Sequence, residues 1–444
     1  MRASAKALAP AEAALRAHEP THFELLNPQA SAVDLQAVLS DGEAYLRIVT
    51  GSHGGYGALV DKNGLRPFRI ALTDEQAGTL ADRIRRTTRI QGRALPDYDL
   101  DASMALYQGL LAPIADRLAQ VRDLDVDTSG ALASIPFAAL VERQPDKAQL
   151  SSIHESQDYT GVAWLARRMS LSNALGPAAL IRLRKAAPPS SAPHAVLYGD
   201  YAPDPHMAAA RLALAKGLSS RCQAEVEHAL TLLGPLPETA DEVRNIAADF
   251  PAARLVFGAQ FTDTDFLSNP DTANADFIMI ATPGVLGVSS CFPEPALLTS
   301  LGAKGDGLIG ASQLLDRDLK VQLVVLSACD TAARGRLDEA SGGLGDGGDA
   351  LSGFARAFIY TGVRNVLVTQ WKVDVAASSA AMAAFVGSAN RPGVNLGQAL
   401  AMARRTLFHQ AEAGHPFYWA AFIVLVDGER RLTSSSEASG KTGA

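Results

Sequence analysis

The sequence predicts an α/β protein with a mostly parallel six-stranded sheet flanked by helices, preceded by a smaller α+β N-terminal portion. Three observations support this class. In the second half of the chain, short apolar runs alternate with segments of helical periodicity. The run 321–326 (VQLVVL) is rich in Val and Leu, as in a strand buried on both faces. The first half instead begins with two short strands joined by a glycine-rich turn.

Length and composition narrow the functional class. The 444 residues are enough for two domains, and 48% hydrophobic with 20% charged residues is typical of a soluble globular chain. The net charge of -7 gives no reason to expect nucleic acid or an anionic membrane as a partner. We see neither a membrane-spanning run nor a secretory signal, and therefore expect a cytoplasmic protein.

The cysteines argue against a metal centre. Cys222, Cys291 and Cys329 are odd in number and widely spaced, which fits neither a disulfide framework nor a zinc site.

The sequence of residues 343–348 matches a dinucleotide-binding fingerprint, but no strand precedes it directly and its charged neighbours are acidic. We therefore expect no metal and no cofactor. The acidic, glycine-rich stretch 335–349 reads as a mobile surface loop.

The N-terminal portion is expected to follow an Ala-rich arm over residues 1–34 and to extend over 35–187. Its first strands, 44–50 and 56–60, form a predicted hairpin with His53 at the tip, where a solvated loop residue is the usual case. Thr73 is a predicted helix N-cap, and residues 105–114 have helical spacing. Pro136 suits a turn between two short elements. The Pro- and Ser-rich stretch 187–193 is the expected domain boundary.

The sheet domain is expected over residues 194–428. Its predicted strands are 194–199, 254–258, 276–281, 321–326, 363–369 and 420–426. Its predicted helices are 238–248, 351–360, 376–385 and 396–410. The remaining residues, 429–444, are of low complexity and read as a disordered tail.

Cys329 is the candidate reactive group. It follows the predicted strand 321–326, at the carboxyl edge where ligands and catalytic groups collect in open α/β sheets. A thiol there is a candidate nucleophile. A buried structural cysteine explains the residue equally well.

Several segments, taken in order, resemble the CHAT domain, a bacterial relative of caspases and separases in the caspase-like clan of cysteine peptidases. The matching segments are LSACDT at 326–331, GFARAFIYTGVRNV at 353–366, QWKVD at 370–374 and PFYWAAF at 416–422, with LYQGLLAP at 106–113 and IPFAAL at 135–140 upstream. The resemblance covers about residues 35–428. It implies a caspase-like sheet and makes Cys329 the nucleophile.

The resemblance also shows what is missing. In the family, the base is the second histidine of a His-x-Ala-Thr-His-Gly motif. Here the matching stretch is Met279-Ile-Ala-Thr-Pro-Gly284, so Pro283 stands at the catalytic histidine and Met279 at the first one. The amide of Gly284 is the implied oxyanion-hole donor. Among the other histidines, His415 precedes an aromatic cluster and is expected to be a packing residue.

The remaining candidate site residues are Asp330, Trp371 and Asp374, which we expect near a bound peptide. Two main hypotheses stay open. One is a pseudo-protease acting as a protein-binding or regulatory module. The other is an active cysteine endopeptidase whose base comes from elsewhere in the chain or from a partner. A small-molecule enzyme on the same scaffold is a third. The resemblance implies a protein or peptide partner, such as a separately encoded sensor.

Overall fold

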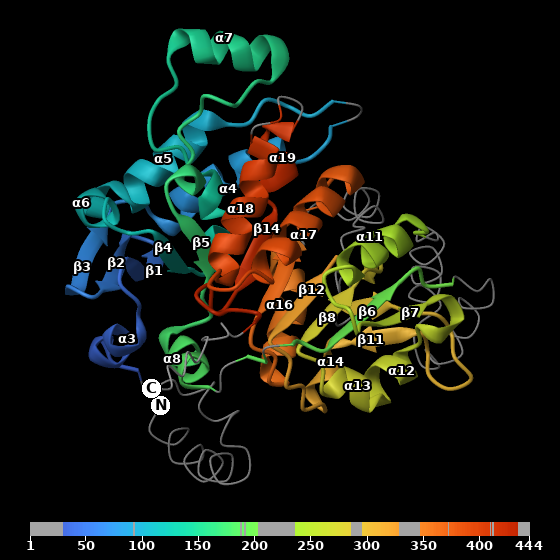
Figure 1. Cartoon of the computed structure of the whole chain (residues 1–444). Helices are drawn as coiled ribbons and strands as arrows, with labels where there is room; N and C mark the ends of the chain where they lie inside the picture. The colour runs from blue at the N-terminus through green and yellow to red at the C-terminus, as the bar shows by residue number, and fades with distance from the viewer. Residues whose placement is uncertain are drawn as a thin grey trace, which may run out of the picture.

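The protein is built on one eleven-stranded sheet with the strand order β3-β2-β1-β4-β5-β14-β13-β12-β8-β6-β7 (Figure 1). The computed structural model describes residues 30–91, 94–186, 189–190, 192–202, 236–285, 295–327, 347–371, 373–408, 410 and 413–433, with the backbone alone for 347–353. The strands of this sheet are β1 (Glu43–Gly51), β2 (Gly54–Asp61), β3 (Gly64–Ile70), β4 (Asp123–Asp127), β5 (Ser170–Asn173), β6 (Ala195–Gly199), β7 (Arg254–Phe257), β8 (Phe277–Ile280), β12 (Leu323–Leu326), β13 (Val366–Thr369) and β14 (Phe422–Leu425).

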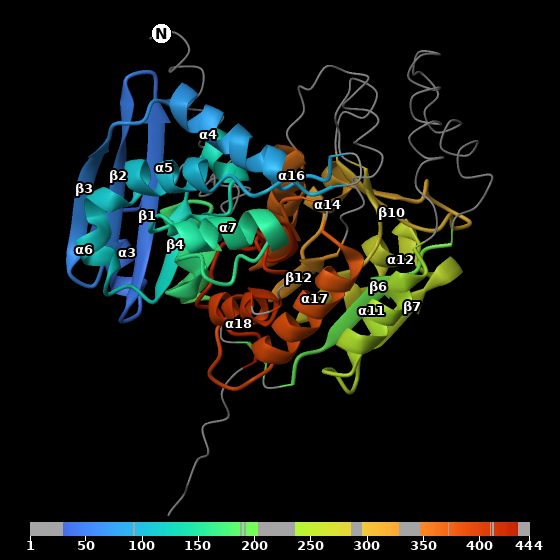
Figure 2. The same ribbon diagram turned by 90° about the horizontal axis from the view of Figure 1, so that it is seen from above.

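The predicted fold class is confirmed. The six strands expected from the apolar runs are β6, β7, β8, β12, β13 and β14. Neighbours among them run parallel, apart from β14, which is antiparallel to β13. The sheet is larger than expected, because β14 also pairs with β5 and thereby joins the N-terminal strands to the same sheet. Seen from above, β1, β2, β3 and β4 lie on the left and β12, β6 and β7 on the right (Figure 2).

Helices cover both faces of this sheet. The longer helices are α3 (Ala32–Val38), α4 (Asp74–Thr87), α5 (Leu100–Leu110), α7 (Lys147–Ser156), α8 (Pro177–Lys185), α11 (Glu238–Ala247), α12 (Asp263–Ser268), α16 (Gly347–Tyr360), α17 (Val375–Ala389) and α18 (Leu396–Phe408). The shorter ones are α6 (Ala115–Leu118), α13 (Pro270–Ala273), α14 (Ala311–Leu315), α19 (Pro416–Trp419), η1 (Ala112–Ile114), η2 (Gly130–Ser134), η3 (Phe137–Ala139), η4 (Leu165–Arg167) and η5 (Gly258–Gln260). A small antiparallel sheet contains β9 (Gly284–Val285), β10 (Ala296–Leu298) and β11 (Leu308–Gly310).

Strand alternation divides the core into two layers. Along β8, Phe277 and Met279 point into the cluster that includes side chains of α11, α17 and α18. Ile278 and Ile280 point the other way, into the cluster that includes α12, α14 and α16. Burying such a side chain contributes about 1.5–3 kcal/mol. The apolar runs that predicted these strands are therefore also what holds the central sheet between its helices.

The N-terminal portion follows its local signals. β1 and β2 form the predicted antiparallel hairpin, and His53 lies exposed in its turn. Thr73 caps α4, since its hydroxyl accepts from the Gln76 backbone N–H (3.2 Å) while the Gln76 side chain accepts from the Thr73 N–H (3.0 Å). Pro136 lies between η2 and η3, as its residue type predicts.

The described residues continue across two of the expected boundaries. Helix α3 spans residue 34, where the arm was expected to end. The described chain also continues past 429, and Leu432 is fully buried.

Among the described residues, no helix combines the length and apolar character that crossing a bilayer requires.

Candidate functional site

The candidate edge is formed by the carboxyl ends of β8 and β12. The two strands are adjacent and parallel, with Met279 opposite Val325 and Ile280 opposite Leu326. The chain therefore leaves both strands at the same level, through Ala281 after β8 and Ser327 after β12. Cys329 and Asp330, together with the predicted loop up to residue 346, lie outside the described residues. The adjacency expected of the strands before Pro283 and Cys329 is thus observed.

Pro283 and its neighbours are tied to β10. The Pro283 carbonyl accepts from the Leu298 backbone N–H (3.0 Å), and the Thr282 hydroxyl donates to the Leu298 carbonyl (2.7 Å). Gly284 begins β9 and pairs with Leu297. These bonds fix the backbone conformation of the segment that resembles the histidine motif. The site roles of Pro283 and Gly284 remain predictions.

The Met279 side chain belongs to the apolar core. It is fully buried in the core layer beside α11, α17 and α18. An imidazole at this position would enter an apolar core, where burial of its charged form is unfavourable. The position that resembles the first histidine of the motif is therefore a packing position in this chain.

A carboxyl group meets Ser327 at this edge. The Ser327 hydroxyl lies 2.8 Å from Glu242 Oε1 and 3.0 Å from Oε2. Glu242 belongs to α11, which packs on β6, and burial raises the pKa of this carboxyl to about 7, while the Ser327 hydrogen bond opposes that rise. Sequence reasoning missed this residue. The sequence predicts the helix 238–248, but nothing in that pattern distinguishes Glu242 from its neighbours.

Trp371 and Asp374 follow β13 at the same edge, since β13 runs parallel to β12. The Trp371 indole N–H donates to the Phe417 carbonyl (3.0 Å). The exposed Asp374 is the N-cap of α17, accepting from the Ala377 N–H (3.0 Å). Both side chains thus have structural partners. Their predicted contact with a peptide remains a prediction.

His415 is a capping and packing residue. Its Nδ1 accepts from the Phe417 backbone N–H (2.9 Å), so Nε2 carries the proton and faces the Pro96 carbonyl at 3.1 Å. The ring packs edge-on against Tyr98 and Tyr159. Burial lowers the pKa of His415 to about 4. The imidazole is therefore neutral at physiological pH, with both nitrogens in use.

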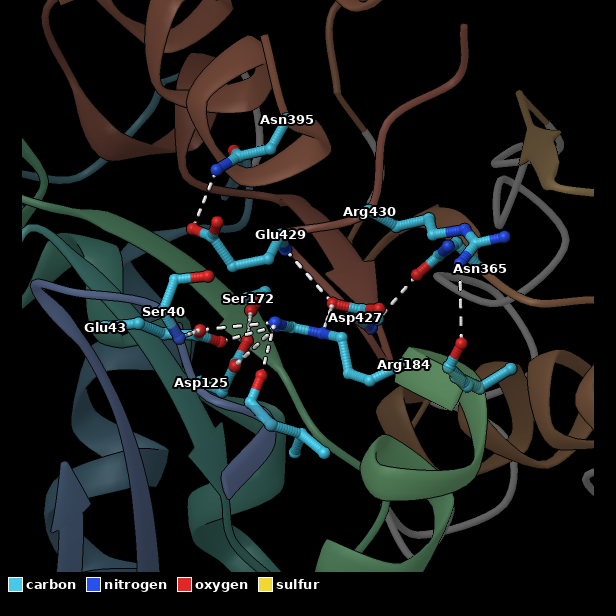
Figure 3. Close-up of polar contacts among 12 residues, drawn as sticks. Ser40, Glu43, Asp125, Ser172, Arg184, Asn365, Asn395, Asp427, Glu429 and Arg430 are labelled. Carbon is cyan, nitrogen blue, oxygen red and sulfur yellow. Dashed lines mark hydrogen bonds and ion pairs between the residues drawn. The ribbon is translucent and has the colours of Figure 1, made fainter. Parts of the chain in front are cut away.

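A second polar cluster lies at the opposite, amino edge of β12 and β13, where β14 ends (Figure 3). Arg184 of α8 stands at its centre. Its Nε donates to Asp427 Oδ1 (2.7 Å), its Nη1 donates to Glu43 Oε2 (3.2 Å), and its Nη2 lies 3.8 Å from Asp125 Oδ2. The three carboxylates come from β1, β4 and the end of β14.

Acidic groups outnumber basic ones in this cluster, which also holds Asp123 and Glu429. Burial, reinforced by the Glu43 charge, raises the pKa of Asp125 well above its usual range. Burial and the charges of Asp123 and Glu43 raise the pKa of Glu429 to about 8. Strong shifts mark functional sites or structural ion networks. Because this cluster joins β1, β4 and α8 to the end of β14, we assign it to the junction of the sheet.

The fold and the position of the candidate site define the class of protein. It is an α/β protein with a mostly parallel sheet, and its candidate site lies at the carboxyl ends of the adjacent central strands β8 and β12. The model of the CHAT domain matches residues 100–427. This chain belongs to the CHAT domain family.

Curated relatives and solved structures are similar to parts of the chain. Tetratricopeptide repeat protein 28 of Mus musculus is 29% identical over 224 residues, which is 50% of this chain and 8% of that protein. Its Homo sapiens counterpart is 34% identical over 134 residues, 30% of this chain and 5% of that protein. The chain thus spans less than a tenth of these relatives.

Two solved structures are similar at 9% sequence identity. The Saccharomyces cerevisiae separase–securin complex has a TM-score of 0.49 and covers 92% of this chain and 32% of the matched chain. The Arg-specific cysteine proteinase gingipain R has a TM-score of 0.40 and covers 81% and 75%.

Proposed function

We propose that this CHAT-domain chain is a pseudo-protease, a peptidase scaffold that acts as a protein-binding or regulatory module. The observation that carries the proposal is Pro283, which occupies the position of the catalytic histidine in the family motif. Proline supplies neither an imidazole nor a backbone N–H. By resemblance, Cys329 is the position of the nucleophile.

The described histidines support this proposal. His415 is buried, neutral and engaged on both nitrogens. His53 lies in the exposed turn between β1 and β2, and His154 is exposed on α7 beside Asp97 (3.2 Å). His194 precedes β6 at the amino end of that strand. Among the described residues, none of these four imidazoles bonds a residue that follows β8 or β12.

The energetic cost of the missing base is large. A free thiol with a pKa near ~8.5 is only a few per cent ionised at neutral pH. A positioned acid–base contributes about 10²–10⁴-fold to the rate and also protonates the leaving amine. Its absence removes roughly 3–5 kcal/mol of transition-state stabilisation. Peptide cleavage by this chain is therefore expected to be negligible, whereas binding needs no base.

The proposed partner is a protein or peptide. The curated relatives are named for tetratricopeptide repeats, and this chain matches only a small part of them. A repeat protein encoded separately is the partner class that the family resemblance supports.

The test measures hydrolysis of a panel of short peptide esters and amides. The wild type should match Cys329→Ala, because a thiol without a base contributes no cleavage. Pro283→His should raise hydrolysis, and the gain should vanish in Pro283→His/Cys329→Ala. Pro283→Ala is the matched control, since it restores the backbone N–H without adding an imidazole. Cleavage by the wild type that is lost in Cys329→Ala would contradict the pseudo-protease assignment.

A further inference from the structure

One face of the N-terminal strands is covered by helices at one end only. The register of β1, β2 and β3 places the outward side chains of this face in rows that run across the strands. The first row is Tyr45, Val60 and Leu65. Its two buried members belong to one core cluster with Leu35 and Leu39 of α3. In Figure 1, α3 and α8 lie below these strands, and α4 and α5 lie above them.

The next two rows of the same face are open to solvent. Val49 and Tyr56, which are direct cross-strand neighbours, are 47% and 65% exposed. Isolated exposed apolar residues are ordinary, whereas contiguous ones mark interaction surfaces. We call the six residues of these two rows the open face: Arg47, Val49, Tyr56, Ala58, Pro67 and Arg69.

The opposite side of these strands is already filled. There Phe68 packs over Gly57, where an added Cβ would lie 2.0 Å from the Phe68 ring. Leu46 and Leu59 are fully buried in the main core on that side. A one-residue slip of the register would exchange the two faces and bury Arg69. The strands therefore present the open face outward in one register.

The open face carries two arginines and no acidic residue, in a chain whose net charge is -7. The Arg69 guanidinium carbon lies 5.8 Å from the centroid of the Tyr56 ring, and Arg69 forms no ion pair with any described residue. The Arg47 side chain is 51% exposed, although it pairs with Asp127 at 2.6 Å. Two accessible guanidinium groups beside an aromatic ring suit a ligand that combines apolar and anionic groups.

The geometry favours a helix over an added strand or a second copy of the chain. β3 is an edge strand, but it contains Pro67, and proline protects edge strands from further pairing because it lacks a backbone N–H. A stable dimer interface takes about 20–30 residues a side, far more than the open face provides. The first row is already covered by α3, so another helix beside α3 would complete the cover of this face.

We propose that the open face is a docking site for an amphipathic helix of a partner protein. An apolar stripe of that helix covers Val49 and Tyr56, and acidic residues at its edges pair with the two arginines. Such helices present their apolar anchors at positions i, i+3 or i+4, and i+7. In the sheet, β4, β5, β14 and β13 separate β1 from β12. The docking site is therefore additional to the candidate edge and independent of the proposed loss of peptidase activity.

The experiment measures binding of a fluorescein-labelled synthetic helix to the full-length protein by fluorescence anisotropy. The probe is a peptide of about 18 residues, or five turns, with leucines on one side and glutamates along both edges of that stripe. The control peptide keeps the leucines and carries lysine in place of each glutamate. The acidic peptide should bind at least roughly tenfold more tightly than the basic one, and added salt should reduce this difference.

Substitutions then locate the binding on the protein. Tyr56→Ser removes the aromatic anchor and Arg69→Glu reverses a charge, so each should weaken binding of the acidic peptide roughly tenfold. Circular dichroism and thermal unfolding verify that both variants fold. Leu315→Ser on α14 and Arg391→Glu after α17 change exposed residues of matched type elsewhere and should leave binding unchanged.

The inference is overturned if the acidic peptide does not bind, or if the basic peptide binds equally well or better. Binding that neither folded Tyr56→Ser nor folded Arg69→Glu weakens would also overturn it. Dimerisation of the wild type that Tyr56→Ser abolishes, measured by light scattering, would assign the open face to a second copy of the chain instead. Peptide hydrolysis by the wild type would contradict the pseudo-protease assignment alone.

Discussion

At the scale of single residues, the candidate site shows how one side chain can suggest two roles. Asp374 lies in a segment that resembles the family, which made it a candidate for peptide contact. In the structure it is the N-cap of α17. The bond to the Ala377 N–H satisfies one of the backbone donors that a helix leaves unpaired at its first turn. A loss of binding on substitution would therefore not by itself identify a binding residue.

Two substitutions at Asp374 separate these roles. Asp374→Ala should lower the free energy of unfolding by about 1 kcal/mol, the usual cost of losing a cap. Asp374→Ser keeps a capping oxygen and should restore most of that loss. Denaturant unfolding of the two variants and the wild type provides the measurement. Equal stability of Asp374→Ala and the wild type would contradict the capping role and return Asp374 to the peptide-binding candidates.

At the scale of elements, the ionic cluster determines how β1, β4 and α8 join the end of β14. Glu429 accepts from the Asn395 amide (2.7 Å), and its pKa of about 8 is raised by burial and by the charges of Asp123 and Glu43. A carboxyl whose pKa is raised on folding contributes stability below its unfolded value, near ~4.5. That contribution is lost as the pH rises through about 8.

Glu429→Gln should therefore stabilise the protein selectively at alkaline pH. The amide imitates the protonated acid and its oxygen still accepts from Asn395. We expect a gain on the order of 2 kcal/mol at pH 9 and almost none at pH 5, after allowance for solvent screening of this partly buried group. Urea unfolding at the two pH values tests this. Glu155→Gln, an exposed carboxyl on α7, is the control. A pH-independent gain would mean that Glu429 is ionised in the folded protein throughout.

The same cluster explains which elements the sequence predicts and which it does not. β8 and β12 are continuous apolar runs, so their burial on both faces is visible in the sequence. The sequence of β4 is Asp-Leu-Asp-Val-Asp, and this alternation of polar and apolar residues predicts a strand with one face exposed to solvent. Asp125 is nevertheless buried, beside Arg184. Its partner lies 59 residues away in the sequence, and no local pattern contains that information.

The residues of the candidate site also differ in whether the sequence alone points to them. The motif makes Pro283 a candidate, because the Ala-Thr-x-Gly frame around it is intact, and its site role stays a prediction. Glu242 could not be identified in this way, because its significance comes from meeting Ser327, which lies 85 residues away in the sequence. Local patterns report backbone geometry and burial. Contacts between distant polar side chains depend on how helices pack on the sheet.

At the scale of the whole molecule, the single sheet joins the two halves that the sequence suggested as separate portions. β5 pairs with β14 near Asn173 and Leu425, and the Val426 N–H donates to the Asn173 carbonyl (2.7 Å). One core cluster extends from β1 and β4 to β8, β12 and β14. Trp164 and Trp419 pack edge-on across the junction, with ring centroids 5.5 Å apart. These contacts predict that the halves unfold together.

Arg184→Met tests that cooperativity. It removes the cation shared by Glu43 and Asp427, both almost fully buried, and should destabilise the protein by on the order of 3 kcal/mol because it leaves buried acids unpaired. In hydrogen exchange with increasing denaturant, β1 and β4 of the wild type should open at the same denaturant concentration as β8 and β12. In Arg184→Met, all four strands should again open together, at a lower denaturant concentration. Arg47→Met removes a half-exposed arginine that pairs with Asp127 and should have little effect. If Arg184→Met released β1 and β4 while β8 and β12 kept their protection, the sheet would consist of two independently stable halves.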